Sequence, residues 1–398
     1  MMGIYFPKEY GGAGGDVLSY AMCVEELAKV CGTTAVIVSA HTSLCCAPIF
    51  EHGTEAQKQK YLPDLLSGKK IGAFGLTEPG AGTDAQGQQT TAVLDESGEN
   101  YILNGSKCFI TNGNVADTFV IIAVTGKTTD KRGRAMKEIS AFVVEKTDPG
   151  FTQGKHEKKM GIRGSSTCDL IFEDCVIPKD RMLGKKGQGF KIAMQTLDGG
   201  RIGIASQALG LGEGAVEEAV KYTKERVQFG KRISQFQNTQ FQLAEMHTRM
   251  QAAQFLVYSA AMKKQNHEPY SMDAAMAKLF AADAASDAAI RIGISPWGFE
   301  GEFAVREALE QRYHLLLGGG PGAAFAGEVN AQAPGLIWSR ADKDGRSVMA
   351  IDIMALPEPG VPFAWEWGLS MQAQEVRLTS AVPSDPHMEA LVAGKAVR

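Results

Sequence analysis

Two glycine-rich segments carry residue types that suit the binding of a flat cofactor. They span residues 72–84 and 104–113, and each combines glycines with a threonine and an aromatic ring beside an expected strand end. Glycine permits the tight turns, and backbone amides and threonine hydroxyls can hydrogen-bond the polar rim of a heterocycle while apolar side chains cover its face. Either segment alone is more simply a hairpin corner. Together they predict a surface for a planar, polar-edged ligand.

Other candidate motifs give weaker signals. The seven histidines are scattered, and none has the neighbours that a zinc site requires, so no metal site is predicted. Residues 318–322 read Gly-Gly-Gly-Pro-Gly and could cradle a phosphate, but proline removes one amide donor. The two segments above therefore remain the main candidates.

Composition excludes several classes of protein. The chain has 398 residues, a net charge of -4 and 44% hydrophobic residues, which predicts a soluble protein of more than one domain. With 41 basic and 45 acidic residues, no positive excess favours nucleic acid. Apolar stretches such as residues 119–124 are too short to cross a membrane, and no signal peptide is expected. Seven cysteines without a CxxC pair favour a reduced, cytoplasmic compartment.

Hydrophobic periodicity divides the chain into blocks. Apolar residues at helical spacing predict a helix over residues 16–30, with Asp16 as its N-cap, and another over 55–66. Short strands are expected at 101–103, 119–124, 139–144 and 170–172, and long helices at 205–226, 241–264 and 271–290. Helices, strands and helices in blocks indicate an α+β fold and disfavour a doubly wound sheet.

The last hundred residues differ in composition from the rest. All four tryptophans and eight of the fifteen prolines follow residue 290, whereas every cysteine precedes residue 176. The predicted domains are therefore a helical domain at 1–70, a β domain at 71–185, a second helical domain at 186–317 and a divergent Gly/Pro-rich tail at 318–398.

The chain resembles the acyl-CoA dehydrogenase family, most closely its bacterial short-chain (butyryl-CoA) members, over residues 2–285. Besides the two segments above, the motifs that carry the resemblance are FPKEYGGAGGD at 6–16, KMGIRGSS at 159–166, TLDGGR at 196–201 and ERVQFGK at 225–231. The resemblance implies a helical N-terminal domain, a central β-barrel-like domain and a C-terminal helical bundle. It also implies a further helix or two before Met2, so that the first domain looks truncated.

The resemblance implies FAD as the cofactor. The positions that match the family's isoalloxazine contacts are Phe74, Leu76, Thr77, Phe109, Ile110 and Thr111. Three more positions match residues that reach the pyrophosphate and adenosine across a subunit interface, which implies a homo-oligomer, either a dimer or a tetramer: Arg226, Phe229 and Gln237. Thr83, Asp198 and Arg201 match positions that contact the acyl-CoA. For Arg201, a helix-surface ion pair is an equally good interpretation.

The implied reaction is α,β-dehydrogenation of a short-chain acyl-CoA to trans-2-enoyl-CoA, with electrons passed to an electron-transferring flavoprotein. A base removes the α-proton of the thioester while hydride leaves the β-carbon. Because that proton is weakly acidic, the thioester carbonyl needs hydrogen bonds that strengthen as enolate charge develops. In the family the base is a glutamate.

The expected base is missing from this sequence. Continuing the family's register places the catalytic glutamate at Gly319, and the alternative position used by some relatives is Gly200. In the same register the glutamine and glycines of a cofactor motif become Ile292, Ser295 and Pro296. No catalytic residue is therefore assigned.

Three interpretations stay open. A substitute base could come from Glu300, Glu302 or Glu310, although surface glutamates are the simpler interpretation of all three. The chain could instead be a catalytically impaired homologue that binds FAD and acyl-CoA without dehydrogenating. Thirdly, the tail after about residue 290 could be a different segment joined to a dehydrogenase.

Overall fold

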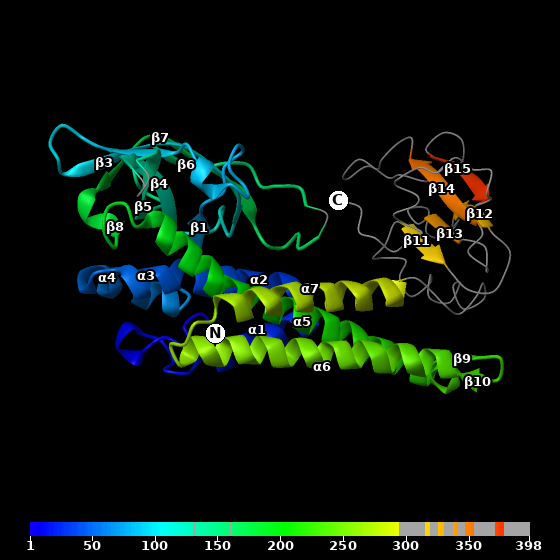
Figure 1. The fold of residues 1–398 in the computed structure, drawn as a ribbon. Helices are drawn as coiled ribbons and strands as arrows, with labels where there is room; N and C mark the ends of the chain where they lie inside the picture. Colours follow the sequence, from blue (N-terminus) through cyan, green and yellow to red (C-terminus); the bar gives the residue numbers. More distant parts are fainter. Residues whose placement is uncertain are drawn as a thin grey trace. The chain divides into compact units, whose positions relative to one another are not determined.

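A computed structural model describes residues 1–129, 133–159 and 161–293, together with five short strands after residue 314 (Figure 1). The described chain divides into two compact units, each described by itself. The first comprises Met1–Glu225 and Ile233–Ala288, and the second comprises Arg226–Arg232 and Ala289–Arg398. The strands of the second unit after residue 314 are β11 (Leu315–Gly318), β12 (Phe325–Val329), β13 (Ile337–Arg340), β14 (Ser347–Ile353) and β15 (Met371–Arg377).

The N-terminal part of the first unit is helical, as predicted. It contains η1 (Lys8–Tyr10), α1 (Val17–Val30), α2 (Gly32–Ala40), the π-helical turn η2 (His41–Cys46), α3 (Ala47–His52) and α4 (Glu55–Leu66). The helices predicted at 16–30 and 55–66 are confirmed as α1 and α4. Asp16 caps α1 as expected, because its carboxylate accepts the backbone N–H of Ser19 at 2.6 Å. A capping box of Thr54 and Gln57 starts α4.

Replacing Asp16 with alanine is expected to lower the free energy of unfolding by about 0.5–2 kcal/mol, since the first turn of α1 loses its side-chain acceptor. Urea denaturation followed by circular dichroism measures the change. Asp16→Asn is the control, because the amide oxygen can still accept the Ser19 N–H. An equal loss in both variants would contradict a capping role.

One helical run in the described part of the chain is long and apolar enough to span a membrane by length and composition. It is Gly32–His52, with a mean hydropathy of 1.4. About 67% of its most apolar window is buried inside the protein. Its buried residues, among them Ala35, Val38, Cys46 and Ile49, belong to two hydrophobic clusters. This packing is typical of a core helix, and core helices can be as long and as apolar as a membrane span.

A sheet follows the first helices and lies beside them in the first unit (Figure 1). Its order is β6-β7-β3-β2-β4-β5-β8, and β1 pairs in parallel with β4. The strands are β1 (Gly72–Gly75), β2 (Thr91–Leu94), β3 (Asn100–Thr111), β4 (Thr118–Thr129), β5 (Ala135–Glu145), β6 (Phe151–Gln153), β7 (Thr167–Pro178) and β8 (Met182–Leu183), with η3 (Ala85–Gly87) and η4 (Lys179–Arg181) in the connections. The four predicted strands lie inside β3, β4, β5 and β7.

Three long helices follow the sheet: α5 (Gly189–Glu225), α6 (Gln237–Gln265) and α7 (Ser271–Gly293), and the last residues of α7, from Ala289 on, belong to the second unit. The turn η5 (Ile233–Gln235) precedes α6, and the short strands β9 (Val227–Gln228) and β10 (Lys231–Arg232) belong to the second unit. The prediction that the first of these helices begins at residue 205 was wrong by four turns. Helices, then a sheet, then helices confirm the predicted α+β fold.

Candidate cofactor and substrate site

The end of β3 carries an exposed aromatic ring on a strained backbone. The pairing of β3 with β7 shifts register between Lys107 and Ile110, which marks a β-bulge. Within this bulge Phe109 has a φ of 58°, and its side chain is 69% exposed. Bulges re-aim side chains next to binding sites, and a positive φ at a bulky residue persists only where its surroundings hold it. The bulge thus turns an apolar ring out of the sheet.

The segment after β1 runs beside this bulge. The backbone N–H of Cys108 donates to the carbonyl of Thr77 at 2.9 Å. Leu76 and Ile110 are buried on the two segments, while Thr77 and Thr111 are partly exposed. Neither threonine hydroxyl has a hydrogen-bond partner among the residues that the structure describes. Residues 76–77 and 108–111 are named the cofactor edge from here on.

Phe74 lies two residues before the cofactor edge. It is partly buried in β1 and packs against the hydrophobic cluster beneath the sheet. The structure therefore brings the two predicted segments together, with Phe74 and Leu76 supplying apolar surface and the threonines supplying polar groups.

Asn112 was not singled out from the sequence, where Asn-Gly looks like an ordinary turn. It is fully buried with a φ of 64°. Its Nδ2 donates to the carbonyl oxygens of Ile37 at 3.2 Å and Gly72 at 3.4 Å, and its Oδ1 has no partner among the described residues. Asn112 thus ties the end of β3 to α2 and β1. Only the tertiary partners reveal that role.

The loop after the cofactor edge carries the predicted substrate residue Thr83. Glu78 and Ala81 exchange backbone hydrogen bonds of 3.2 and 3.0 Å, which closes a tight turn before it. A Cβ added at Gly80 or Gly82 would meet no atom within 4 Å, so the loop faces open space. Thr83 itself is exposed. Residues 79–89 are named the acyl-CoA loop from here on.

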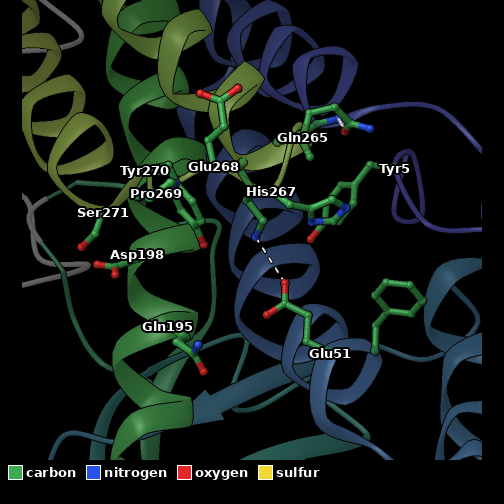
Figure 2. A pocket seen from close by; sticks show the side chains of 13 residues that line it. Tyr5, Glu51, Gln195, Asp198, Gln265, His267, Glu268, Pro269, Tyr270 and Ser271 are labelled. Carbon is green, nitrogen blue, oxygen red and sulfur yellow. Dashed lines mark hydrogen bonds and ion pairs between the residues drawn. The ribbon is translucent and has the colours of Figure 1, made fainter.

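Asp198 and Arg201 lie one turn apart on α5 and form an ion pair with each other. This is the helix-surface pair that the sequence left as an alternative. Asp198 also lines a cavity of about 650 Å³ between α3, α5 and the connection from α6 to α7 (Figure 2). In the same cavity Lys264 Nζ pairs with a Glu51 carboxylate oxygen at 3.5 Å and lies 5.7 Å from the Tyr270 ring centroid. The cavity is thus lined by charges of both signs.

Gly200, the alternative position for the catalytic glutamate, is buried on α5. A Cβ there would lie 2.7 Å from Leu44 Cδ2 of the π-helical turn η2. Leu44 therefore covers this position. Gly319 and the substitute bases Glu300, Glu302 and Glu310 lie outside the described residues, as do Ser295 and Pro296. Ile292 belongs to α7, but its side chain is not described.

The three residues predicted to reach the cofactor's pyrophosphate and adenosine lie in two places. Arg226 and Phe229 belong to the β9–β10 segment of the second unit, where Phe229 has a φ of 51° and is 73% exposed. Gln237 is exposed at the first position of α6 in the first unit. A role for them across a subunit interface stays a prediction.

The cofactor edge fits a planar heterocycle with a polar rim. An exposed phenylalanine ring can cover its face, and two unpaired threonine hydroxyls can bond its edge. In the described part of the chain no group of three His, Cys, Asp or Glu side chains is arranged to hold a metal ion.

Comparison with known proteins agrees with this geometry. Family models of the acyl-CoA dehydrogenases match the chain in three parts: the N-terminal domain at residues 1–69, the middle domain at 73–175 and the C-terminal domain at 187–294. A short-chain specific acyl-CoA dehydrogenase of Clostridium acetobutylicum is 61% identical over 287 residues, which is 72% of this chain and 74% of that protein.

Solved structures show the same likeness. Butyryl-CoA dehydrogenase from Megasphaera elsdenii has a TM-score of 0.69 and 51% identity, covering 75% of this chain and 77% of that one. A chain from a structure described as the electron transferring flavoprotein of Acidaminococcus fermentans has a TM-score of 0.69 and 54% identity, covering 78% and 82%.

The fold and the cofactor edge define a flavoprotein of the oxidoreductase class. The chain belongs to the acyl-CoA dehydrogenase family. It is similar to short-chain and butyryl-CoA dehydrogenases, and FAD is the cofactor of this family. The resemblance and the cofactor expected from the sequence are thereby confirmed.

Proposed function

We propose that this chain dehydrogenates short-chain acyl-CoA thioesters, such as butyryl-CoA, to trans-2-enoyl-CoA and passes the electrons to an electron-transferring flavoprotein. Its likeness to short-chain dehydrogenases supports the substrate class, and its likeness to a chain in an electron transferring flavoprotein structure supports the acceptor. A cytoplasmic location and a homo-oligomer, either a dimer or a tetramer, belong to the same proposal.

The single observation that carries the proposal is the bulge that exposes Phe109 beside two unpaired threonine hydroxyls. Phe109 would cover the ring of FAD, and Thr77 and Thr111 would hydrogen-bond its polar rim. FAD, when bound, would supply the acceptor for the hydride that leaves the substrate β-carbon. Phe74, Leu76 and Ile110 would exclude water beneath the ring. Arg226, Phe229 and Gln237 would hold its phosphate and adenosine portion.

The acyl-CoA side of the site uses Thr83, Asp198 and Arg201. Thr83 is exposed on the acyl-CoA loop directly after the cofactor edge, where a thioester beside the flavin would meet it. The ion pair holds the Arg201 guanidinium at Asp198, beside a cavity that is open to a ligand. We also propose the domain limits predicted from the sequence, which end in a divergent segment at 318–398.

A second function is favoured by a specific observation. In the register that the resemblance implies, both positions of the family's catalytic glutamate fall on glycine, at 319 and 200, and glycine cannot accept a proton. The alternative is a homologue that binds FAD and acyl-CoA but does not remove the α-proton. Glu300, Glu302 and Glu310 are the residues to replace if turnover is found.

Product formation separates the two functions. The purified full chain is incubated with butyryl-CoA and a one-electron dye acceptor, and trans-2-butenoyl-CoA is measured by mass spectrometry. The dehydrogenase proposal expects product that accumulates over many turnovers. Binding of butyryl-CoA without product would instead establish the impaired homologue. Boiled protein with free FAD is the control for uncatalysed dye reduction.

Gly200→Glu is expected to raise turnover, most of all when Leu44 is also trimmed. A Cβ at position 200 would lie 2.7 Å from Leu44 Cδ2, the end of a flexible side chain, so Leu44 has to shift to make room for it. Leu44→Ala combined with Gly200→Glu removes the clash and adds a base. Initial rates of enoyl-CoA formation are compared with Leu44→Ala alone, and equal rates would count against position 200 as a base position.

A further inference from the structure

Lys107 is a fully buried lysine directly before the bulge of the cofactor edge. Its side chain has 0% exposure, although it carries an ammonium group. All three of its N–H groups have acceptors: Glu78 Oε1 at 2.7 Å, Gln88 Oε1 at 3.0 Å and the backbone carbonyl of Leu76 at 3.2 Å. Leu76 belongs to the cofactor edge, Glu78 directly precedes the acyl-CoA loop, and Gln88 lies within that loop.

Glu78 fixes both ends of the acyl-CoA loop with one carboxylate. Its Oε2 accepts the backbone N–H of Gln89 at 2.6 Å, and its Oε1 accepts that of Thr90 at 3.0 Å as well as the Lys107 ammonium. Glu78 also closes the turn with Ala81 at the start of the loop. The loop that carries Thr83 is therefore clamped at its two ends by a single buried ion pair.

Gln88 and Thr90 extend this network. The Gln88 amide nitrogen donates to Ala85 O at 3.2 Å, and its backbone carbonyl accepts Lys137 Nζ at 2.6 Å. The Thr90 hydroxyl donates to Ser106 O at 3.2 Å, on the strand that bears Lys107. The end of the loop is thus held against β3 and β5.

Burial makes this arrangement costly, so stability alone is a poor reason for it. A buried ion pair is often no more stable than apolar residues of similar volume, whereas a buried charge left without its partner is strongly destabilising. Burial lowers the pKa of Lys107 to about 8. For Glu78, burial acts to raise the pKa, and the hydrogen bonds from Lys107 and Thr90 act to lower it. The hydrogen bonds have the larger combined effect, so the pKa of Glu78 lies below its usual value. At neutral pH both groups are charged.

We propose that Lys107 is a positioning residue that couples the cofactor edge to the acyl-CoA loop, through Leu76 on one side and Glu78 and Gln88 on the other. The proposal rests on the proposed function, since it assigns FAD to the edge and acyl-CoA to the loop. Lys107 touches neither ligand in this account. It sets the backbone positions that both ligands meet, so its removal should weaken both together.

The test compares Lys107→Met with Lys179→Met in the full-length protein. Lys179 is an exposed lysine of the same domain that also pairs with a glutamate, Glu99, at 2.7 Å. FAD dissociation constants come from flavin fluorescence, and acyl-CoA affinity comes from the flavin spectral shift with the product trans-2-butenoyl-CoA, which binds without reducing the flavin. We expect Lys107→Met to weaken both ligands by about 10- to 100-fold and Lys179→Met to change neither.

A double variant separates positioning from a structural role and covers the case in which Lys107→Met does not fold. Lys107→Met with Glu78→Gln removes both charges but keeps only one oxygen to accept the Gln89 and Thr90 N–H groups, so its melting temperature should recover in part towards that of the wild type, and Glu78→Gln alone is the control for the lost acceptor. The proposal expects weak FAD and acyl-CoA binding in this variant despite the recovery. Binding that recovers along with stability would overturn the proposal.

Two further results would distinguish a failure of the positioning role of Lys107 from a failure of the proposed function. Unchanged affinities in a folded Lys107→Met would overturn the positioning role while leaving the proposed function intact. If the wild-type chain bound no FAD, both the proposed function and the positioning role of Lys107 would be wrong. FAD binding by the wild-type chain is therefore measured before any variant.

Discussion

Phe142→Ala should lower the free energy of unfolding by about 3–5 kcal/mol, the largest expected effect on stability. Phe142 lies on β5 with 0% exposure, opposite Ile121 of β4 and Met182 of β8. Its ring lies 5.0 Å from that of Tyr101. Truncation removes apolar contacts on every side and leaves a cavity that the paired strands cannot close.

Urea denaturation of the full chain measures this loss. Phe255→Ala is the matched control, because Phe255 is 71% exposed on α6 and should change stability by less than about 1 kcal/mol. If the two variants lost similar stability, Phe142 would not be part of the core as described.

Phe109→Ala is expected to have the second large effect, which is on the binding of the cofactor. The exposed ring on the bulge is expected to cover the flavin, and its loss should weaken FAD binding by about 10- to 100-fold. Fold stability should barely change without FAD, since the side chain is 69% exposed. Flavin fluorescence during titration of the FAD-free protein gives the dissociation constant.

Phe255→Ala serves again as the control, since it removes an equally exposed phenylalanine away from the edge. An FAD affinity in Phe109→Ala that matches the control would place the cofactor elsewhere. Removal of Phe109 should also affect FAD more than butyryl-CoA. Lys107→Met, in contrast, is expected to affect both ligands.

The sequence predicted local features well where the local signal was strong. Asp16 followed by a helical repeat predicted α1, and helical spacing over residues 55–66 predicted α4. The start of α5 was missed, since the helix was expected from residue 205 and begins at Gly189. Tertiary packing explains two of its glycines: a Cβ at Gly203 would lie 2.3 Å from Ser39 Oγ, and one at Gly210 would lie 2.1 Å from Glu25 O. Close helix approach overrides helix propensity here.

Strand lengths were underestimated for a related reason. The run Asn104-Gly105-Ser106-Lys107 looks like a turn, yet β3 continues through it. Gly105 has a φ of 139°, and a Cβ there would lie 2.7 Å from Thr90 Cα. Lys107 is tolerated inside the strand because Glu78, 29 residues earlier, supplies its counter-charge. Periodicity cannot reveal a partner so far away.

The candidate site was found from the sequence by residue type and family resemblance, not by geometry. Thr77 and Thr111 were chosen as hydroxyl donors, and the structure places their segments side by side through the Cys108–Thr77 hydrogen bond. Asn112 and Lys107 were missed as positioning residues, since an asparagine in an Asn-Gly turn and a lysine in a polar run carry no local sign of burial.

The most direct test of the central claim is the visible flavin spectrum of the purified protein under anaerobic conditions, before and after butyryl-CoA is added. The account predicts that the oxidised flavin band bleaches, because hydride from the β-carbon reaches the flavin only if a residue of this chain removes the α-proton. A band that shifts on binding but keeps its intensity would contradict the dehydrogenase proposal and identify a flavoprotein that binds acyl-CoA without a base.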